Sequence, residues 1–339
     1  MPTIQDVART AQVSPATVSR VLNGSFAVSE DKRKKVLDAV EALGYSLPVR
    51  THAEPAGRTI LLLSAIEKPA LFHAVRQEAT QAGYNVVFGL AGEFFDGLEY
   101  AKQLIKSLDS KQLAGILLLN IVHIDEELRT MLNAYPVVQI ERQIELPGSS
   151  IVATDNCSAM HEAVSHLIAQ ARKHIAYITM QSGSWMRSTV FELRRRGYIS
   201  ALADHGLEIN SKYIINTDFS MEGGESACAQ LLALHPVPDA VCCAGDALAL
   251  GVMHALQTRG LRIPQDIAVS GFDNDPYAAF ITPALTTVDL NLEQIGREAA
   301  QLLIRMATSQ EEPRRTLLIP HQLIVRASSE TARLFHEIF

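Results

Sequence analysis

Residues 3–24 read TIQDVARTAQVSPATVSRVLNG, and this stretch predicts two short helices joined by a tight turn. Its first apolar residues recur at the spacing of one helix face: Ile4, Val7, Ala8 and Ala11. Thr3, followed three residues later by Asp6, resembles a capping box at the start of the first helix. The stretch therefore opens with an amphipathic helix.

The second helix is predicted to begin at Ser14, a favourable N-cap residue, with Pro15 at the first helical position, where its missing N–H costs nothing. Its apolar residues would face the first helix: Val18, Val21 and Leu22. Small, hydroxylated or cationic side chains remain outside, and such side chains let a helix enter the major groove of DNA: Ala16, Thr17, Ser19 and Arg20. An ordinary pair of bundle helices fits this spacing equally well.

A third amphipathic helix is predicted over residues 29–45, with Ser29 as its cap and Gly44 at its end. Acidic residues fill its first turn, which suits the helix dipole. Three helices in about 45 residues have the usual size of a helix-turn-helix module. This third helix favours DNA binding over a simple bundle.

Residues 3–45 resemble the headpiece of the LacI/GalR family of bacterial transcription regulators, through IQDVA (4–8), VSPATVSRVLN (13–23) and LGY (43–45). The resemblance implies that the helix after Ser14 is the recognition helix. It places three residues at base-reading positions: Pro15, Ala16 and Arg20. It places others at phosphate-contacting positions: Thr3, Ser14, Thr17, Asn23 and Ser29. Ser19, on the same outward side, completes the predicted DNA-binding surface.

The composition of the 339 residues, 47% hydrophobic and 20% charged, is that of a globular protein with two or three domains. No apolar run approaches the length of a membrane span, and no charged-then-apolar leader is present, so we expect a cytoplasmic protein without a membrane partner. The four cysteines have no metal-ligand spacing, and no metal or cofactor is predicted. Free buried thiols fit a reducing compartment.

The net charge of −7 is unevenly distributed. Residues 1–58 hold eight Lys and Arg against six Asp and Glu, a net +2, whereas the remainder holds 22 against 31, a net −9. A modestly cationic head on an acidic body concentrates attraction for DNA at the head. We therefore expect operator affinity to come from two heads bound together and from direct contacts.

Residues 46–58 lose all periodicity and contain two prolines and a glycine, which predicts a linker. Members of the family usually carry a short hinge helix here, whose leucine wedges into the minor groove. That motif is absent and the linker is shorter, so kinking by a hinge leucine is not expected. Arg50 or Arg58 reaching a phosphate and a fully solvated linker both remain open.

From Arg58 onward, predicted strands and helices alternate. Unbroken apolar runs indicate strands buried on both faces of a parallel sheet: 59–63, 84–88, 115–119 and 136–140. A second set follows: 174–178, 213–216, 240–243 and 267–272. Helical patterns separate the strands: about 70–82, 96–110, 125–133, 157–170, 188–204, 221–234 and 246–259. Two such units side by side predict a two-lobed ligand binder, with the ligand beyond the carboxyl ends of the strands.

The body resembles the periplasmic-binding-protein-like (type I) sensor of the same family, through pieces such as VATDN (152–156), GFDN (271–274) and PALTTV (283–288). The predicted class is thus α/β, an all-α headpiece on a bilobed body of two doubly wound parallel sheets. The resemblance implies that the chain returns to the first lobe near 287 and leaves it near 321. The predicted domains are a headpiece at 1–46, a linker at 47–58 and an effector-binding, dimerising body at 59–339. Lobe 1 would span about 59–156 and 288–320, and lobe 2 about 157–287 and 321–330.

Three residues are predicted to contact a ligand between the lobes. Asp273 ends a strand in GFDN, and its carboxylate could accept from two sugar hydroxyls or a ring N–H, although it could instead cap the next turn. Arg194 matches an Arg-x-x-Gly-Tyr pattern that lies near the effector in the family, where a triple-Arg run otherwise suggests a solvated helix face. Phe219 could stack on a flat ligand or belong to the core.

Three further candidates depart from the family pattern. Phe72 follows a shortened segment after the first strand, Glu141 stands where relatives have Asp, and Asp246 follows Gly245 where relatives often have Asn-Asp. These differences indicate an effector other than the commonest one. A sugar, a sugar phosphate or a nucleobase all fit, and binding could induce or co-repress.

These features together predict a homodimeric repressor that binds a palindromic operator under the control of a small-molecule effector. An enzyme on a doubly wound fold is disfavoured because the sequence has no Gly-x-Gly-x-x-Gly after the first strand, no Walker loop and no Gly-x-Ser-x-Gly. A transport receptor would share the bilobed body, but the fused head argues against export. The last ten residues lack sustained heptads, which favours a dimer over a zipper tetramer.

Overall fold

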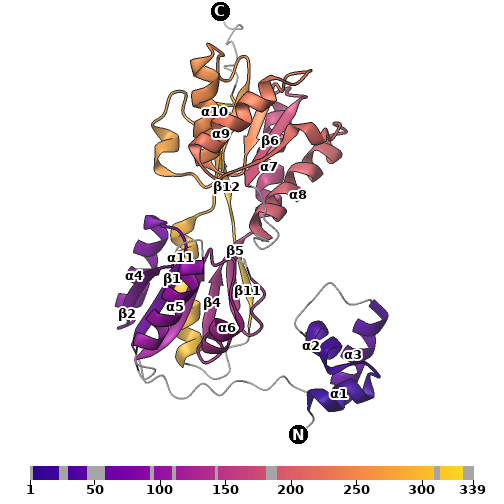
Figure 1. Ribbon diagram of the computed structural model, residues 1–339, viewed down its shortest axis with the longest axis vertical. Helices are drawn as coiled ribbons and strands as arrows, with labels where there is room; N and C mark the ends of the chain where they lie inside the picture. Colours follow the sequence, from indigo (N-terminus) through magenta and orange to yellow (C-terminus); the bar gives the residue numbers. More distant parts are fainter. Residues whose placement is uncertain are drawn as a thin grey trace, which may run out of the picture. The chain divides into compact units, whose positions relative to one another are not determined.

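The computed structural model describes residues 3–22, 30–43, 58–91, 95–108, 112–141, 144–180, 189–308 and 314–330. The chain separates into a headpiece unit that holds the first three helices and a body unit that holds all the strands of these ranges (Figure 1). Asn23, Ser29 and all of the predicted linker except Arg58 lie outside the described residues.

The headpiece consists of three helices: α1 (Ile4–Thr10), α2 (Pro15–Leu22) and α3 (Glu30–Leu43). The predicted capping box starts α1, since the Thr3 side chain and the Asp6 side chain each accept from the other's backbone N–H. Ser14 Oγ accepts a 3.1 Å hydrogen bond from the Thr17 N–H and caps α2 as predicted. Small apolar side chains form the core: Val7, Ala8, Ala11, Val18, Val21, Val36 and Ala39.

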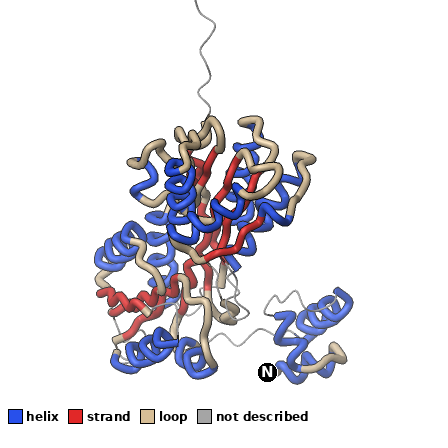
Figure 2. Tube along the Cα trace, turned by 45° about the horizontal axis from the view of Figure 1, so that its top comes forward, coloured by secondary structure: helices blue, strands red, loops and turns tan. Residues whose placement is uncertain are grey.

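The first sheet of the body has six parallel strands in the order β11-β5-β4-β3-β1-β2. Their bounds are β1 (Thr59–Ser64), β2 (Asn85–Leu90), β3 (Leu113–Leu119), β4 (Val137–Ile140), β5 (Ser150–Thr154) and β11 (Thr316–Ile319). Four helices flank this sheet (Figures 1 and 2): α4 (Pro69–Gln81), α5 (Phe95–Ser107), α6 (Glu126–Leu132) and α11 (Leu292–Thr308). The sheet and these helices are called lobe 1.

The second sheet has four parallel strands in the order β7-β6-β8-β9. Their bounds are β6 (Ile175–Met180), β7 (Ile214–Thr217), β8 (Ala240–Cys243) and β9 (Ala268–Ser270). Its helices are α7 (Asn156–Ala169), α8 (Thr189–Asp204), α9 (Met221–Leu232) and α10 (Asp246–Thr258). This second sheet with its helices is called lobe 2. Its core includes the stacked rings of Tyr177 and Tyr198, 5.0 Å apart.

Residues that follow lobe 2 in the sequence also contribute to lobe 1. A two-stranded antiparallel ribbon is formed by β10 (Thr287–Asp289) and β12 (Gln322–Ile324). Between them in sequence, α11 packs on lobe 1 and β11 pairs with β5. Gly296 of α11 lies so close to α4 that an added Cβ would be 2.7 Å from the Leu71 carbonyl oxygen. Lobe 1 is thus completed by residues that come after lobe 2.

Two of the runs predicted to be buried on both faces form edge strands with exposed residues. The run 84–88 falls largely in β2, at one edge of the six-stranded sheet, where Phe88 and Leu90 are exposed. The run 213–216 overlaps β7, the edge of the second sheet, where Asn216 is exposed. Apolar content alone does not distinguish an edge strand from a central one. An edge strand pairs with a single neighbouring strand, yet its covered face still favours apolar residues.

None of the helices in the described part of the chain has both the length and the apolar character that a membrane span requires.

Candidate functional site

Part of the predicted DNA-contacting set lies exposed at the start of α2. Ser14, Pro15 and Ala16 are exposed, whereas Val18 and Val21 are buried against the other helices. The first turn of α2 contains no acidic residue, so the positive end of the helix dipole suits a phosphate. The exposed side chains at the start of α2 are therefore small or polar and carry no negative charge.

Two hydroxyls are held at the start of this face. Ser14 Oγ and Thr17 Oγ1 are 2.9 Å apart, and Thr3 is exposed at the start of α1. The Thr3 hydroxyl donates to the Asp6 carboxylate over 2.7 Å, and this bond is the first cause of a lowered pKa of Asp6. The backbone of Ser19 and Arg20 continues α2, while Asn23 and Ser29 lie outside the described residues.

A cavity of about 270 Å³ lies between the lobes, at the carboxyl ends of their strands. Lobe 1 supplies residues at or after the ends of β1, β3 and β4, together with two that follow β10: Ile66, Glu67, Lys68, Leu119, Asn120, Val122, Glu141, Leu290 and Leu292. Lobe 2 supplies residues at or after the ends of β6, β7 and β9 and on α8: Met180, Val190, Phe191, Arg194, Phe219 and Asp273. This is where an open α/β sheet binds its ligands.

Arg194 and Asp273 meet in this cavity. The Arg194 side chain is buried, and its Nη2 donates to Asp273 Oδ1 over 3.2 Å. Its Nε donates to Asn156 Oδ1 over 2.8 Å, and its Nη1 donates to the Ala244 carbonyl. The guanidinium lies 3.8 Å from the centre of the Phe272 ring. Contacts along the edge of the guanidinium and over its face therefore hold Arg194 in place. The run of three arginines, which suggested a solvated helix face, thus contains one buried residue.

Asp273 is presented by a distorted turn. Its φ is +100° and that of Asn274 is +52°, values that side-chain-bearing residues rarely adopt. The Asp273 N–H donates to the Val288 carbonyl over 2.9 Å, which ties the turn to β10. Neighbouring contacts hold this strained backbone, which directs the Asp273 carboxylate into the cavity.

Asp246 does not line the cavity, which corrects the expectation from sequence. It is 1% exposed; its Oδ1 accepts from Thr287 Oγ1 over 2.6 Å and its Oδ2 from the Asp275 N–H over 2.7 Å. Burial raises the pKa of Asp246 to about 7. Its contacts from the first turn of α10 reach the segment that follows Asp273, so it supports that turn rather than contacting a ligand.

Phe72 also lies outside this cavity. Because α4 begins at Pro69, Phe72 is one turn into the helix, where its ring stacks on Phe88 with centroids 5.0 Å apart. These two rings border a separate shallow hollow. The shortened segment after β1 thus brings Lys68, and not the aromatic ring, to the cavity.

Glu141 and Phe219 do line the cavity. Glu141 accepts from the Thr154 N–H over 2.8 Å and from Asn156 Nδ2 over 2.7 Å, and burial raises its pKa to about 7. The Phe219 ring lies 5.2 Å from that of Phe191, and an added Cβ at Gly245 would be 2.2 Å from it. The cavity therefore combines aromatic walls with carboxylates and a guanidinium.

Several residues of the site were not predicted. Lys68 Nζ donates to Asp273 Oδ2 over 3.2 Å and to Asp275 Oδ1 over 3.1 Å. Burial lowers the pKa of Lys68, but the charges of the two aspartates outweigh it, and the pKa is raised. Asn156, Phe191 and Asn120 also take part. A position shortly after a buried strand was the available signal for Lys68 and Asn120.

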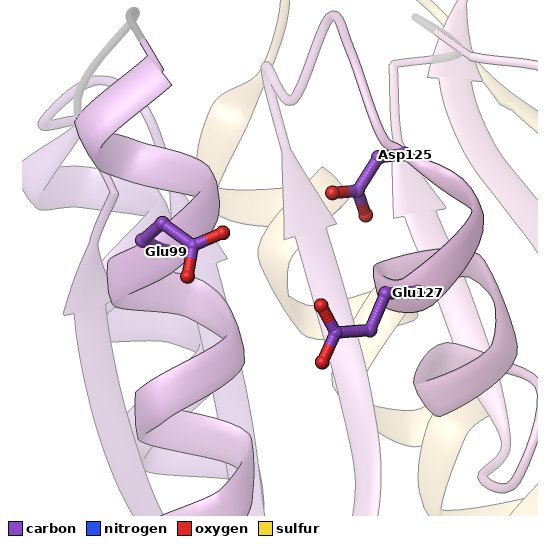
Figure 3. A group of neighbouring side chains, drawn as sticks. All are labelled: Glu99, Asp125 and Glu127. Carbon is purple, nitrogen blue, oxygen red and sulfur yellow. The ribbon is translucent and has the colours of Figure 1, made fainter.

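A second polar cluster lies apart from the cavity in lobe 1. The carboxylates of Glu99 on α5 and of Asp125 and Glu127 at the start of α6 converge (Figure 3). The ammonium of Lys102 lies 2.7, 2.6 and 3.0 Å from them, and its hydrogen bond to Asp125 is the first cause of a raised Lys102 pKa. The lysine thus takes the place that a metal cation would need, and the cluster ties α5 to α6.

Comparisons with known proteins agree with both parts. The profile described as "Bacterial regulatory proteins, lacI family" matches residues 3–47, and that of "Periplasmic binding protein-like domain" matches residues 164–329. The HTH-type transcriptional repressor CytR of Escherichia coli (strain K12) is 33% identical over 335 residues, 96% of each chain. Catabolite control protein A of Priestia megaterium is 30% identical over 338 residues, 97% of this chain and 99% of the relative.

A solved structure matches nearly the whole chain. The transcriptional regulator CelR in complex with cellobiose is 30% identical, has a TM-score of 0.72 and covers 97% of this chain and 100% of its own. These relatives are named as a control protein, a transcriptional repressor and a transcriptional regulator, and each match covers 96–97% of this chain. The chain belongs to the lacI family of bacterial regulatory proteins and is a DNA-binding transcriptional repressor controlled by a small-molecule effector.

Proposed function

We propose that the chain binds a palindromic operator as a cytoplasmic homodimer, and that a sugar, a sugar derivative or a nucleobase-like molecule in the interlobe cavity controls this binding. The Arg194–Asp273 pair on the lobe 2 side of the cavity carries the proposal. A carboxylate held by an arginine can accept from ligand hydroxyls or ring N–H groups, while Phe191 and Phe219 offer apolar faces.

The proposed division is a headpiece at 1–46, a linker at 47–58 and a body at 59–339, with lobe 1 at about 59–156 and 288–320 and lobe 2 at about 157–287 and 321–330. The course of the strands supports it, since α11 and β11 belong to lobe 1. In the headpiece, nine residues would contact DNA: Thr3, Ser14, Pro15, Ala16, Thr17, Ser19, Arg20, Asn23 and Ser29. In the cavity, Glu141, Arg194, Phe219 and Asp273 would contact the effector.

The proposed mechanism couples lobe closure to the spacing of two heads. An effector that contacts both lobes favours the arrangement in which its contacts are made, and it shifts the equilibrium by its differential affinity, about 1–3 kcal/mol in typical coupling. Two heads about one DNA turn apart can bind both half-sites together. A change in their spacing would alter operator affinity, and either sign of control is compatible with this cavity.

A second copy of the chain is needed for two heads, and the edge of lobe 1 supports such an assembly. Phe88 and Leu90 on β2 are 36% and 45% exposed, and Tyr100 of α5, which packs against β2, is 42% exposed. An exposed apolar edge strand is a pairing surface unless it is covered. We therefore place part of the dimer contact at this edge.

Selection of DNA from a random library with the full chain, followed by gel shift, tests the DNA-binding part. A truncated chain of residues 59–339 is expected to lose binding to the selected sequence. Equal binding by the fragment and by the whole chain would refute the headpiece assignment. A thermal-shift screen over sugars and nucleobases tests the cavity, because a ligand that binds the native state alone raises the melting temperature. An Arg194→Ala chain is expected to lose that shift.

A further inference from the structure

Lys68 connects the two lobes across the cavity. It follows β1 of lobe 1, directly before α4, and its ammonium reaches the carboxylates of Asp273 and Asp275 in lobe 2 at 3.2 and 3.1 Å. The side chains of Lys68 and Asp273 are only 17% and 12% exposed. The contact is therefore a largely enclosed part of the cavity wall. It is not a surface ion pair, which would contribute little to stability.

The charges around this contact are balanced. Lys68 and Arg194 contribute two positive charges, and Asp273 and Asp275 contribute two negative ones, all within one chain of contacts. Glu67 and Glu141, which line the same cavity, add negative charge when they are ionised. The wall is thus neutral or negative, and an anionic ligand would meet no net attraction.

The hydrogen-bonding capacity that remains suits a hydroxyl or an N–H group. An ammonium has three donors, and the contacts among the described residues use two of those of Lys68. A carboxylate has about four acceptor positions, and Lys68 and Arg194 use two of those of Asp273. A hydroxyl can accept from Lys68 and donate to Asp273 at once. An ionised phosphate oxygen can only accept, so it could not donate to Asp273 and would be repelled by that carboxylate.

We infer that Lys68 is a specificity-determining residue, and that the effector is an uncharged molecule bearing hydroxyl or N–H groups and not a phosphate ester. This inference rests on the proposed role of the cavity as the effector site. It narrows the three ligand classes compatible with the sequence to two, sugars and nucleobase-like molecules without phosphate. In this inference, Asp275 supplies the negative charge that balances the second positive charge of the cavity wall.

Matched pairs of ligands test the inference on the full chain. Ribose with ribose 5-phosphate, glucose with glucose 6-phosphate, and adenosine with AMP are compared by thermal shift and calorimetry. The uncharged member of a pair is expected to bind at least tenfold more tightly than its phosphate ester. A phosphate ester that binds wild-type protein as tightly as its uncharged partner, and loses that binding in a Lys68→Met chain, would overturn the inference and leave the effector site intact.

Charge variants supply a readout that needs no known effector. Asp275→Asn removes one negative charge from the wall but keeps an acceptor oxygen for Lys68. Glu225→Gln is the matched control, since Glu225 is a half-exposed residue of α9 paired with His254. Inorganic phosphate is titrated against each chain at constant ionic strength. Because phosphate stabilises proteins generally by exclusion from their surface, only differences between chains are interpreted.

The Asp275→Asn chain is expected to gain saturable phosphate binding that wild type and Glu225→Gln lack. A Lys68→Met, Asp275→Asn double variant should lose that gain, because the ammonium that lost a counter-charge is gone. Equal phosphate responses in all four chains would refute the charge-balance argument. The gel-shift test of the headpiece is a separate measurement. A failure of the proposed function can therefore be distinguished from a failure of this inference.

Discussion

Asn156 Oδ1 accepts a 2.8 Å hydrogen bond from Nε of Arg194, and the same amide donates from Nδ2 to Glu141 in lobe 1. One buried amide therefore connects the carboxylate that follows β4 with the guanidinium that contacts Asp273. The direction of both bonds fixes which way the amide points, because its oxygen must face the arginine. Asn156 is a positioning residue between the two lobes.

Replacing Asn156 tests this role. Asn156→Ala leaves Arg194 Nε without its acceptor, and we expect a loss of about 1–3 kcal/mol in the free energy of unfolding and at least a tenfold loss in effector affinity. Asn156→Asp keeps the acceptor but places a carboxylate against Glu141, so it should recover affinity as the pH is lowered. Chemical denaturation and calorimetry measure both. Unchanged effector affinity in Asn156→Ala would contradict the positioning role.

Glu141 is predicted to make stability depend on pH. Burial raises its pKa from 4.5 to about 7, so the folded protein holds this proton more tightly than the unfolded chain does. Stability from this group is greatest at low pH, falls as the pH rises from about 4.5 to about 7, and is constant above; one pKa unit corresponds to about 1.4 kcal/mol. Asp246, with a pKa raised to about 7, acts in the same direction.

The measurement is the difference in unfolding free energy between wild type and Glu141→Gln across pH 4 to 9. The wild type should lose roughly 2–3 kcal/mol relative to the variant between the acidic and neutral ends. The control is Glu192→Gln on α8, an exposed carboxylate whose ion-pair partner Arg195 stays charged over the whole pH range, unlike a histidine partner. Its difference from wild type should lack that fall. A Glu141→Gln difference with no slope over this range would refute the raised pKa.

Gly271 provides the space for Asp246. An added Cβ would be 2.1 Å from Asp246 Oδ1, so Gly271→Ala must displace the carboxylate that supports the turn at Asp273. We expect a loss of about 1–3 kcal/mol in unfolding free energy, the usual effect of overpacking, together with weaker effector binding.

The control for this variant is Gly206→Ala, because an added Cβ there meets nothing within 4 Å and Gly206 lies beyond the C-terminal end of α8. Its φ of +68° makes alanine strained, so this chain should lose stability while its effector affinity stays that of wild type. Denaturation and calorimetry separate the two effects. Equal losses of effector affinity in the two variants would argue against a specific role of the space at Gly271.

Ala16, exposed in the first turn of α2, tests the recognition face. Ala16→Asp adds a negative charge to the predicted base-reading surface and opposes the approach of DNA; operator affinity should fall at least tenfold, about 1.4 kcal/mol. Melting of the body and effector binding should be unchanged. Gel shift at several salt concentrations measures the effect. The matched control is Ala42→Asp on α3, since Ala42 is also exposed but lies outside the predicted face.

Much of the architecture could be predicted because its signals are local. The strands in the middle of the sheets and the helices between them follow from continuous apolar runs and helical spacing, as β3 and α10 illustrate. The short strands β5, β10, β11 and β12 were not predicted as strands. Each is short, and β11 and β12 are only partly buried, so their pairing comes from distant segments and not from a local pattern.

The site shows the same division. Asp273 and Arg194 lie where a motif and a strand end placed them, because a few backbone bonds determine those positions. Phe72 and Asp246 do not line the cavity. The position of Phe72 depends on where α4 begins, and the position of the Asp246 carboxylate depends on its hydrogen bond with the distant Thr287. Lys68 was missed for a related reason: a lysine after a strand has no typical partner until the opposite lobe supplies two carboxylates.

The pairing of β11 with β5 has a consequence for synthesis of the protein. The strand Ser150–Thr154 emerges from the ribosome long before its neighbour Thr316–Ile319, and α11 appears in the same late interval. Most of lobe 1 is therefore translated first but acquires its last strand and a covering helix only when the chain is nearly complete. Contacts so distant in sequence form slowly, and the nascent chain exposes an unfinished sheet edge in the meantime. The headpiece, by contrast, has all its core residues within the first few dozen positions and can fold as soon as it emerges.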